Sequence, residues 1–143
     1  MKSNKGAAAA GLIIYIASFL LICSVIAVIT TFFYNNNKYL SSEATAAAEY
    51  DILNVYLASE AKTEENSVIS VSEDGKKIDF ESGNSYIFKE EDKTIYLKNE
   101  IKNKYFILCN YIDNAEFQEG TNNFTLDLTI LGKQYTQTYN FGN

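Results

Sequence analysis

An uninterrupted run of apolar residues dominates the first quarter of the chain. From Ala7 to Tyr34 it reads AAAAGLIIYIASFLLICSVIAVITTFFY, without lysine, aspartate or glutamate. A helix of these 28 residues would extend about 42 Å, which exceeds the ~30 Å hydrocarbon core of a bilayer. The pattern therefore predicts a transmembrane helix over residues 7–34.

Beyond this run the pattern becomes amphipathic, but its helical period continues. The chain has no proline, and no glycine lies between Gly11 and Gly75, so nothing forces the helix to stop, although the three asparagines at 35–37 could host a local bend. We expect the helix to continue over residues 35–62. Its predicted apolar face consists of Leu40, Ala44, Ala48, Ile52, Tyr56 and Ser59, with Leu53 and Leu57 beside it and the acids, Glu60 included, mostly elsewhere.

After a polar break at residues 63–66 the period becomes strand-like. Residues 105–111 are nearly all apolar, which is typical of a fully buried strand or of one short helix, and periodicity does not choose between them. The fold class predicted is α+β, a long N-terminal helix packed on a small antiparallel β-sheet built from residues 67–143. Hairpins are expected from strands 68–72 and 77–80 around Asp74-Gly75, 85–89 and 94–98 around residues 90–93, and 124–131 and 134–141 around Gly132-Lys133.

Charge divides the chain into two parts. All 12 basic residues are lysines; Lys2, Lys5 and Lys38 stand in a region without acids, which leaves nine lysines against 18 acids, a net charge of −9, for the rest. Because positive residues favour the cytoplasmic side, the amino terminus is expected in the cytoplasm and the acidic domain on the other side of the membrane. A domain of this charge offers no surface for a phosphate backbone, which argues against direct nucleic-acid binding.

Few side chains are suited to catalysis or metal binding. The chain has no histidine, which excludes Ser-His and Cys-His dyads, and we expect Cys23, in the apolar run, and Cys109, in the domain core, to be free thiols. The acids at 73–74 and 90–92 lie at predicted turns, where solvated charge is usual, and their spacing matches no calcium loop, although calcium binding there stays open. We therefore expect no enzymatic activity, no cofactor and no metal site.

The first six residues resemble a prepilin leader. MKSNKG followed directly by a long apolar helix is similar to the start of type IV pilins and type II secretion pseudopilins. The resemblance implies that a prepilin peptidase cuts between Gly6 and Ala7 and that the new amine of Ala7 is methylated. It also implies assembly with other pilin subunits on a pilus assembly platform, and the order of helix and strands agrees with the family over the whole chain.

One position departs from the family's common pattern. The usual continuation is Phe-Thr-Leu-x-Glu, whereas Ala7 to Gly11 here read AAAAG. The family's glutamate pairs in the membrane with the free amine of a neighbouring subunit, and an unpaired charge there would be costly. Gly11 occupies that position, so the chain has no carboxylate there to form this pair. A subset of minor pilins and the tip pseudopilins also lack this glutamate, and KGAAAAGLII resembles the start of their sequences. The resemblance therefore implies a place at the filament tip or at the start of assembly.

Two interpretations follow. The favoured one is a minor pilin or pseudopilin, a structural subunit that lies in the cell membrane and then in a type IV pilus-like filament. The alternative is an uncleaved single-pass protein whose extracytoplasmic domain binds a partner or acts as a sensor. Lys-Gly before an apolar helix also occurs in such proteins, and Ala7, Ala10 and Gly11 equally suit a close helix–helix contact. Adhesion, motility, DNA uptake and secretion are all compatible with the favoured interpretation.

Overall fold

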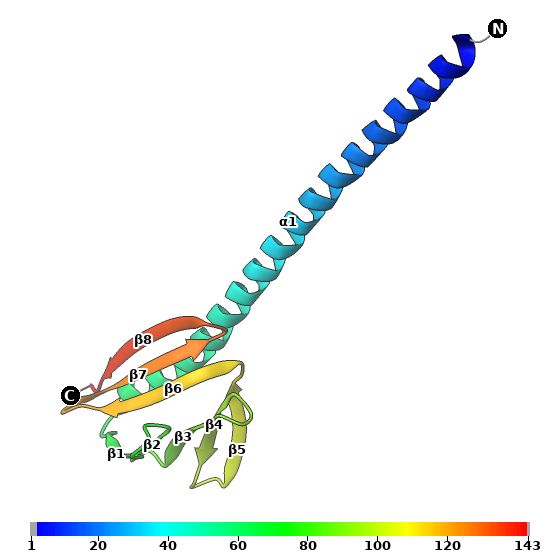
Figure 1. Ribbon diagram of the computed structural model, residues 1–143. Coiled ribbons are helices and arrows are strands. Elements are labelled where there is room, and N and C mark those ends of the chain that lie inside the picture. The colour runs from blue at the N-terminus through cyan, green and yellow to red at the C-terminus, as the bar shows by residue number, and fades with distance from the viewer. Residues whose placement is uncertain (1–2, 143) are drawn as a thin grey trace. The chain divides into compact units, whose positions relative to one another are not determined.

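A computed structural model describes residues 3–142, which form one helix followed by eight strands (Figure 1). Antiparallel pairing joins all neighbouring strands. The α+β class predicted from the sequence is therefore confirmed. The elements are α1 (Ser3–Lys62), β1 (Val68–Val71), β2 (Lys77–Phe80), β3 (Asn84–Lys89), β4 (Thr94–Asn99), β5 (Lys104–Cys109), β6 (Ile112–Glu119), β7 (Asn123–Ile130) and β8 (Lys133–Asn140).

The chain divides after Ser41 into two compact units. The first consists of the N-terminal part of α1. It contains the residues of the apolar run, and every residue from Gly6 to Ser41 is exposed. The helix continues through Asn35, Asn36 and Asn37 without interruption, because neither proline nor a competing contact breaks its backbone hydrogen bonds.

The second unit contains the rest of α1 and all eight strands, which form two sheets rather than the single sheet expected. The five-stranded sheet has the order β1-β2-β3-β4-β5, and the three-stranded sheet has the order β6-β7-β8. The chain changes sheet at Asn110 and Tyr111, where Tyr111 adopts a left-handed φ of 60°. Such a conformation is uncommon for a residue with a bulky side chain and turns the chain sharply.

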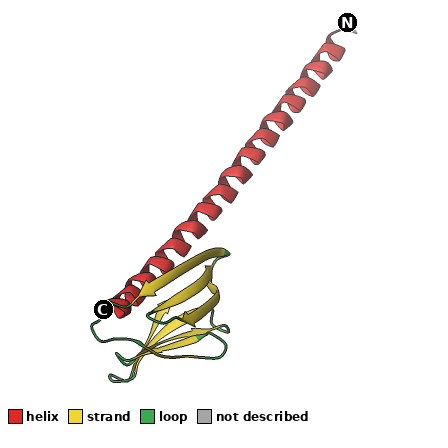
Figure 2. Cartoon of the chain, turned by 90° about the vertical axis from the view of Figure 1, so that its left-hand side faces the viewer, coloured by secondary structure: helices red, strands yellow, loops and turns green. Residues whose placement is uncertain are grey.

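Both sheets share one core with the last turns of α1 (Figure 2). The ring of Phe80, in β2, contacts Phe124, in β7, at 5.1 Å between centroids and Tyr86, in β3, at 5.7 Å. Edge-to-face contacts of this kind add to the stabilisation by apolar burial. Cys109 is fully buried in this core, and its thiol is free, as expected.

The hairpin between β1 and β2 also connects the two sheets. Gly75 at its tip has a φ of 69°, and its carbonyl accepts a hydrogen bond of 2.7 Å from the backbone N–H of Phe117 in β6. A Cβ at this position would stand 2.7 Å from Cγ of Glu116. Glycine is therefore required here by backbone conformation and by space.

The segment at 105–111, for which a fully buried strand and a short helix were both open, forms most of strand β5 and the connection to β6, and this strand is not fully buried. Tyr105, Phe106 and Ile107 are exposed, because β5 is the last strand of its sheet and no further strand of the described chain covers it. The last hairpin also turns one residue earlier than predicted, at Leu131-Gly132, which both have positive φ. This is the conformation that a two-residue hairpin loop needs.

Candidate functional site

The residues of the expected processing site lie near the start of α1. Gly6 and Ala7 are both helical and exposed, and a Cβ on Gly6 would meet nothing within 4 Å. The first backbone N–H groups of a helix have no partner within it, so helices open most readily at their ends. The bond between Gly6 and Ala7 therefore lies near the end of the helix, where helices open most readily.

Gly11 lies in open space one turn further along α1. It is exposed, and a Cβ added there would meet nothing within 4 Å. A glutamate side chain at this position would therefore fit without a clash inside the chain. The absence of an acid at Gly11 is not imposed by the packing of its own subunit.

The apolar part of α1 has the features of a membrane span. The part of the chain that the structure describes contains one candidate span, with a mean hydropathy of 2.9 over its most apolar window and no buried residue there. The hydroxyl of Ser24 donates to the carbonyl of Leu21 at 2.7 Å, and that of Thr31 donates to the carbonyl of Ala27 at 2.9 Å. Both hydroxyls are thus satisfied within the helix, as a lipid environment requires.

Within the second unit, α1 buries a different face from the one predicted. The buried residues lie at intervals of four or seven positions, which places them on one side of the helix, in the core shared with the two sheets. The predicted face is exposed instead, because the helix carries two neighbouring apolar stripes and the sheets cover only one of them. The buried stripe consists of Ala46, Leu53, Leu57 and Ala61.

The uncovered stripe is an extended apolar surface, which we call the outer face of α1 and define by Ala48, Ile52, Val55 and Tyr56. The three large side chains are 46%, 66% and 46% exposed, respectively. They repeat at the helical spacing that brings residues to one side. A single exposed apolar side chain is ordinary, but a continuous row of them indicates a surface that another molecule covers.

A buried carboxylate fixes the end of α1 to the loops of the five-stranded sheet. Glu60 is 6% exposed, contrary to its predicted place on the polar face. Its Oε2 accepts hydrogen bonds from Ser82 Oγ at 2.7 Å and from Asn66 Nδ2 at 2.9 Å. Its Oε1 accepts from the amide of Asn84 and from the hydroxyl of Tyr86.

All four donors to Glu60 are uncharged. Asn66 Nδ2 also donates to the Glu60 carbonyl at 2.9 Å and so caps the last turn of α1. Burial, followed by the charge of Glu60, raises the pKa of the Tyr86 phenol, so that this hydroxyl stays a donor. The arrangement holds a carboxylate in place rather than exposing it to a substrate. Sequence reasoning missed it because its donors come from the segment after α1, from the turn before β3 and from β3 itself.

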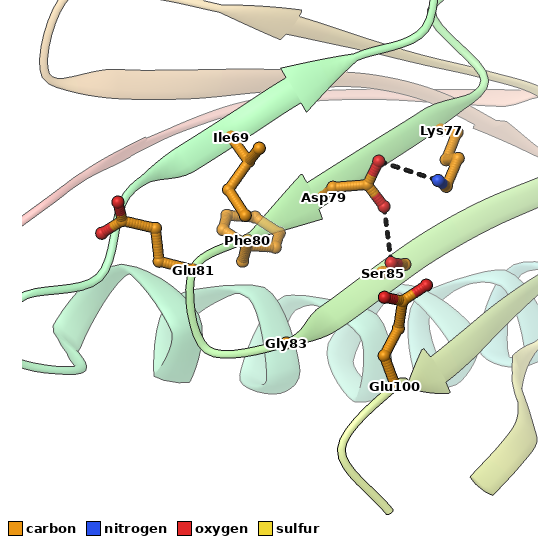
Figure 3. Close-up of a pocket in the computed structure, with 8 residues that line it drawn as sticks. All are labelled: Ile69, Lys77, Asp79, Phe80, Glu81, Gly83, Ser85 and Glu100. Atoms are coloured by element: carbon orange, nitrogen blue, oxygen red, sulfur yellow. Dashed lines mark hydrogen bonds and ion pairs between the residues drawn. The ribbon is translucent and has the colours of Figure 1, made fainter. Parts of the chain in front are cut away.

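A groove of about 290 Å³ lies on the five-stranded sheet (Figure 3). Asp79 lies at its centre and accepts hydrogen bonds from Ser85 at 2.5 Å and from Ser70 at 3.1 Å. It also forms an ion pair with Lys77 at 2.8 Å. Glu81 and Glu100 also line it.

Partners within the chain already satisfy the central carboxylate of this groove. Partial burial alone would raise the pKa of Asp79, but the hydrogen bonds from Lys77, Ser85 and Ser70 outweigh it and lower the pKa. Asp79 is therefore ionised and a poor base near neutral pH. No three potential ligands gather to hold a metal ion within residues 3–142.

The residues singled out by the sequence, Gly6, Ala7 and Gly11, are exposed in α1 and are not among those that line this groove. The structure adds to them the outer face of the same helix, which includes Ala48, Ile52 and Tyr56 of the apolar face that periodicity predicted. No protein family, no curated protein and no solved structure matches the chain.

Proposed function

We propose that the chain is a minor pilin or pseudopilin, a structural subunit of a type IV pilus-like filament. In this account a prepilin peptidase removes residues 1–6, and α1 then passes from the membrane into the core of the filament. The partners are the helices of other pilin subunits, and the β domain is a spacer or contact surface without enzymatic activity.

The observation that carries the proposal is that α1 has two apolar stripes beyond the apolar run, one buried and one exposed. One stripe of the helix is used by its own sheets, and the outer face beside it is left uncovered. A plain membrane anchor needs apolar residues only as far as the bilayer extends. An uncovered stripe beyond the apolar run is instead what a helix needs when it packs against similar helices outside the membrane.

Gly11 supports a place at the tip or at the start of assembly. An acid there would fit in the subunit, so its absence reflects what lies around the subunit in the assembly. A tip subunit has no neighbour above it whose amine requires a carboxylate, whereas a shaft subunit without that acid would lack one ion pair in lipid.

The proposed orientation follows from charge. Lys2 and Lys5 hold the amino terminus on the cytoplasmic side, where the peptidase would reach the bond after Gly6, and the acidic β domain lies outside. The filament would then carry a surface of net negative charge at this subunit.

Expression with and without a prepilin peptidase tests the proposal. The intact mass of the membrane-extracted chain should fall by the mass of residues 1–6 when the peptidase is present. Gly6→Leu should abolish this change because a bulky side chain at the cleaved bond does not fit a site shaped for glycine. Ala10→Leu, in the same helix but away from the bond, is the matched control and should be cut normally. An unchanged mass of the wild-type chain would instead favour the uncleaved, membrane-anchored binding domain.

A further inference from the structure

The open edge of the five-stranded sheet is apolar. Three consecutive residues of β5, Tyr105, Phe106 and Ile107, are 47%, 50% and 60% exposed. Successive side chains of a strand point to opposite faces, so both faces of the sheet are uncovered here. Ile101, in the turn before β5, is 78% exposed and extends the same surface.

This edge lacks the protection that sheet edges usually have. Natural edge strands are shortened, bulged or charged, because their free N–H and C=O groups otherwise pair with another strand. The opposite edge, β1, has only four residues and a register shift. By contrast, β5 has six residues, its register shift lies near its end, and no charged residue follows Lys104 within it. Among the described strands, only β4 pairs with β5.

The two ends of β5 carry opposite charge. Lys102 and Lys104 stand at its start, and neither forms an ion pair with a described residue. At its end, Oε2 of Glu49 accepts the backbone N–H of Asn110 at 2.7 Å. Glu49 provides the negative charge at this end, because Asp113, just beyond in β6, is already ion-paired with Lys93 at 3.1 Å.

A strand with a basic start and an acidic end is complementary to an antiparallel copy of itself. In such a pair the start of each strand lies beside the end of the other, and an isologous contact of this kind closes as a dimer. A strand of uniform charge would repel its own copy. We propose that β5 pairs with β5 of a second copy of this chain, which joins the two five-stranded sheets into one sheet of ten strands across a two-fold axis.

The interface would be small, but membrane attachment compensates for this. One edge strand buries less surface than a dimer needs when both partners diffuse freely. Two copies held in one membrane by α1 meet at a raised effective concentration, so that a weak contact suffices. The inference rests on the β domain and the candidate span, and it does not depend on cleavage or filament assembly.

Cysteine cross-linking in membranes tests the proposal. Two differently tagged full-length copies, both with Cys23→Ala to remove the thiol of the apolar run, are expressed together in a host without a prepilin peptidase or a pilus assembly platform. Tyr105→Cys, Phe106→Cys and Ile107→Cys are introduced one at a time. Side chains directly opposite each other in an antiparallel pair lie about 5 Å apart at Cβ, so oxidation should link the residue nearest the axis several-fold more than its neighbours.

Ile69→Cys on β1 is the matched control, because Ile69 is 63% exposed at the opposite edge of the same sheet. It should remain largely monomeric. Cross-linking at β5 that is no stronger than at Ile69, or equal at all three β5 positions, would indicate random collision and overturn the proposal. A β5 cross-link to a protein of another mass would also overturn it.

A charge reversal at the start of β5 provides a second, independent test. Lys104→Glu should lower the cross-linked fraction by about threefold, because it replaces an attraction at the rim of the interface by a repulsion, and an exposed ion pair has an effect of this size. Lys62→Glu at the end of α1 makes the same change in net charge and should leave the fraction unchanged. Equal effects of the two substitutions would show that net charge alone matters and would contradict pairing through β5.

Discussion

Glu60 illustrates how one residue can connect a helix to a sheet. Its carboxylate lies at the end of α1, where the helix dipole disfavours a negative charge, so neutral donors must offset the cost of burial. Asn66, Ser82, Asn84 and Tyr86 provide four such donors. Because a single side chain satisfies donors from three segments, its loss affects all of them together.

Replacing this carboxylate should destabilise the β domain. Glu60→Ala leaves several buried donors without an acceptor, which costs about 1–3 kcal/mol for each group that stays unsatisfied. We expect a total loss of about 3 kcal/mol in the free energy of unfolding, in line with the larger effects of single substitutions. Denaturant unfolding of the full chain in detergent, followed by near-ultraviolet circular dichroism, measures it.

Glu64→Gln provides the control, because Glu64 is exposed in the segment that follows α1. It should change the free energy of unfolding by less than about 0.5 kcal/mol. Equal stability of Glu60→Ala and wild type would contradict the role that we assign to the buried carboxylate.

Gly11 is informative at the same scale, since an acid is structurally permitted there. Gly11→Glu should leave cleavage after Gly6 intact, because the new side chain meets nothing in its own subunit. If the chain acts at the tip, the variant should be processed but should support fewer filaments, counted by electron microscopy, because its carboxylate lies in lipid without a partner amine. Gly11→Ala is the control and should behave as wild type. A Gly11→Glu variant that works as an ordinary shaft subunit would contradict a tip position.

At the scale of elements, α1 has two apolar faces beyond the apolar run, one buried and one exposed. The stripe that includes Leu53 and Leu57 lies in the core of the domain, and the large side chains of the outer face are 46–66% exposed. Periodicity identifies both stripes as apolar, but it does not say which of them the sheets cover. For this reason the sequence predicted a long amphipathic helix but did not identify the stripe that the sheets cover.

A pair of substitutions separates these two faces. Val55→Asp, on the outer face, should leave the free energy of unfolding within about 0.5 kcal/mol of wild type and should abolish recovery of the chain in filaments sheared from cells. Leu53→Ala, two residues away on the buried face, should lower the free energy of unfolding by about 2–5 kcal/mol through the cavity that it leaves. Normal incorporation of a folded Val55→Asp chain would contradict a role of the outer face in assembly.

The strands show which parts of the fold local chemistry determines. The β1–β2 hairpin could be predicted because Asp74-Gly75 provides the turn, and Gly75 indeed has positive φ. The exposure of β5 could not be predicted, because an apolar segment is expected to be buried unless it is known to be the last strand of a sheet. The division into two sheets depends on the turn at Tyr111, a residue whose sequence context contains neither glycine nor proline.

At the scale of the whole molecule, we propose that the exposed apolar helix, its second apolar stripe and the acidic β domain together make an assembly subunit. Gly6 and Ala7, the processing site expected from the leader, are exposed near the start of α1. The buried network at Glu60 and the groove around Asp79 contribute to the fold, and neither presents an unsatisfied group to a substrate.

The most direct test of an assembly role is the mass of the chain recovered from filaments sheared from the cell surface. The account predicts that the recovered chain begins at Ala7, carries a methylated amine and lacks residues 1–6, and that Gly6→Leu removes it from this fraction while it accumulates in the membrane. Recovery of the full-length chain from Met1 in the membrane alone, with none in the filament fraction of cells that make filaments, would contradict the account.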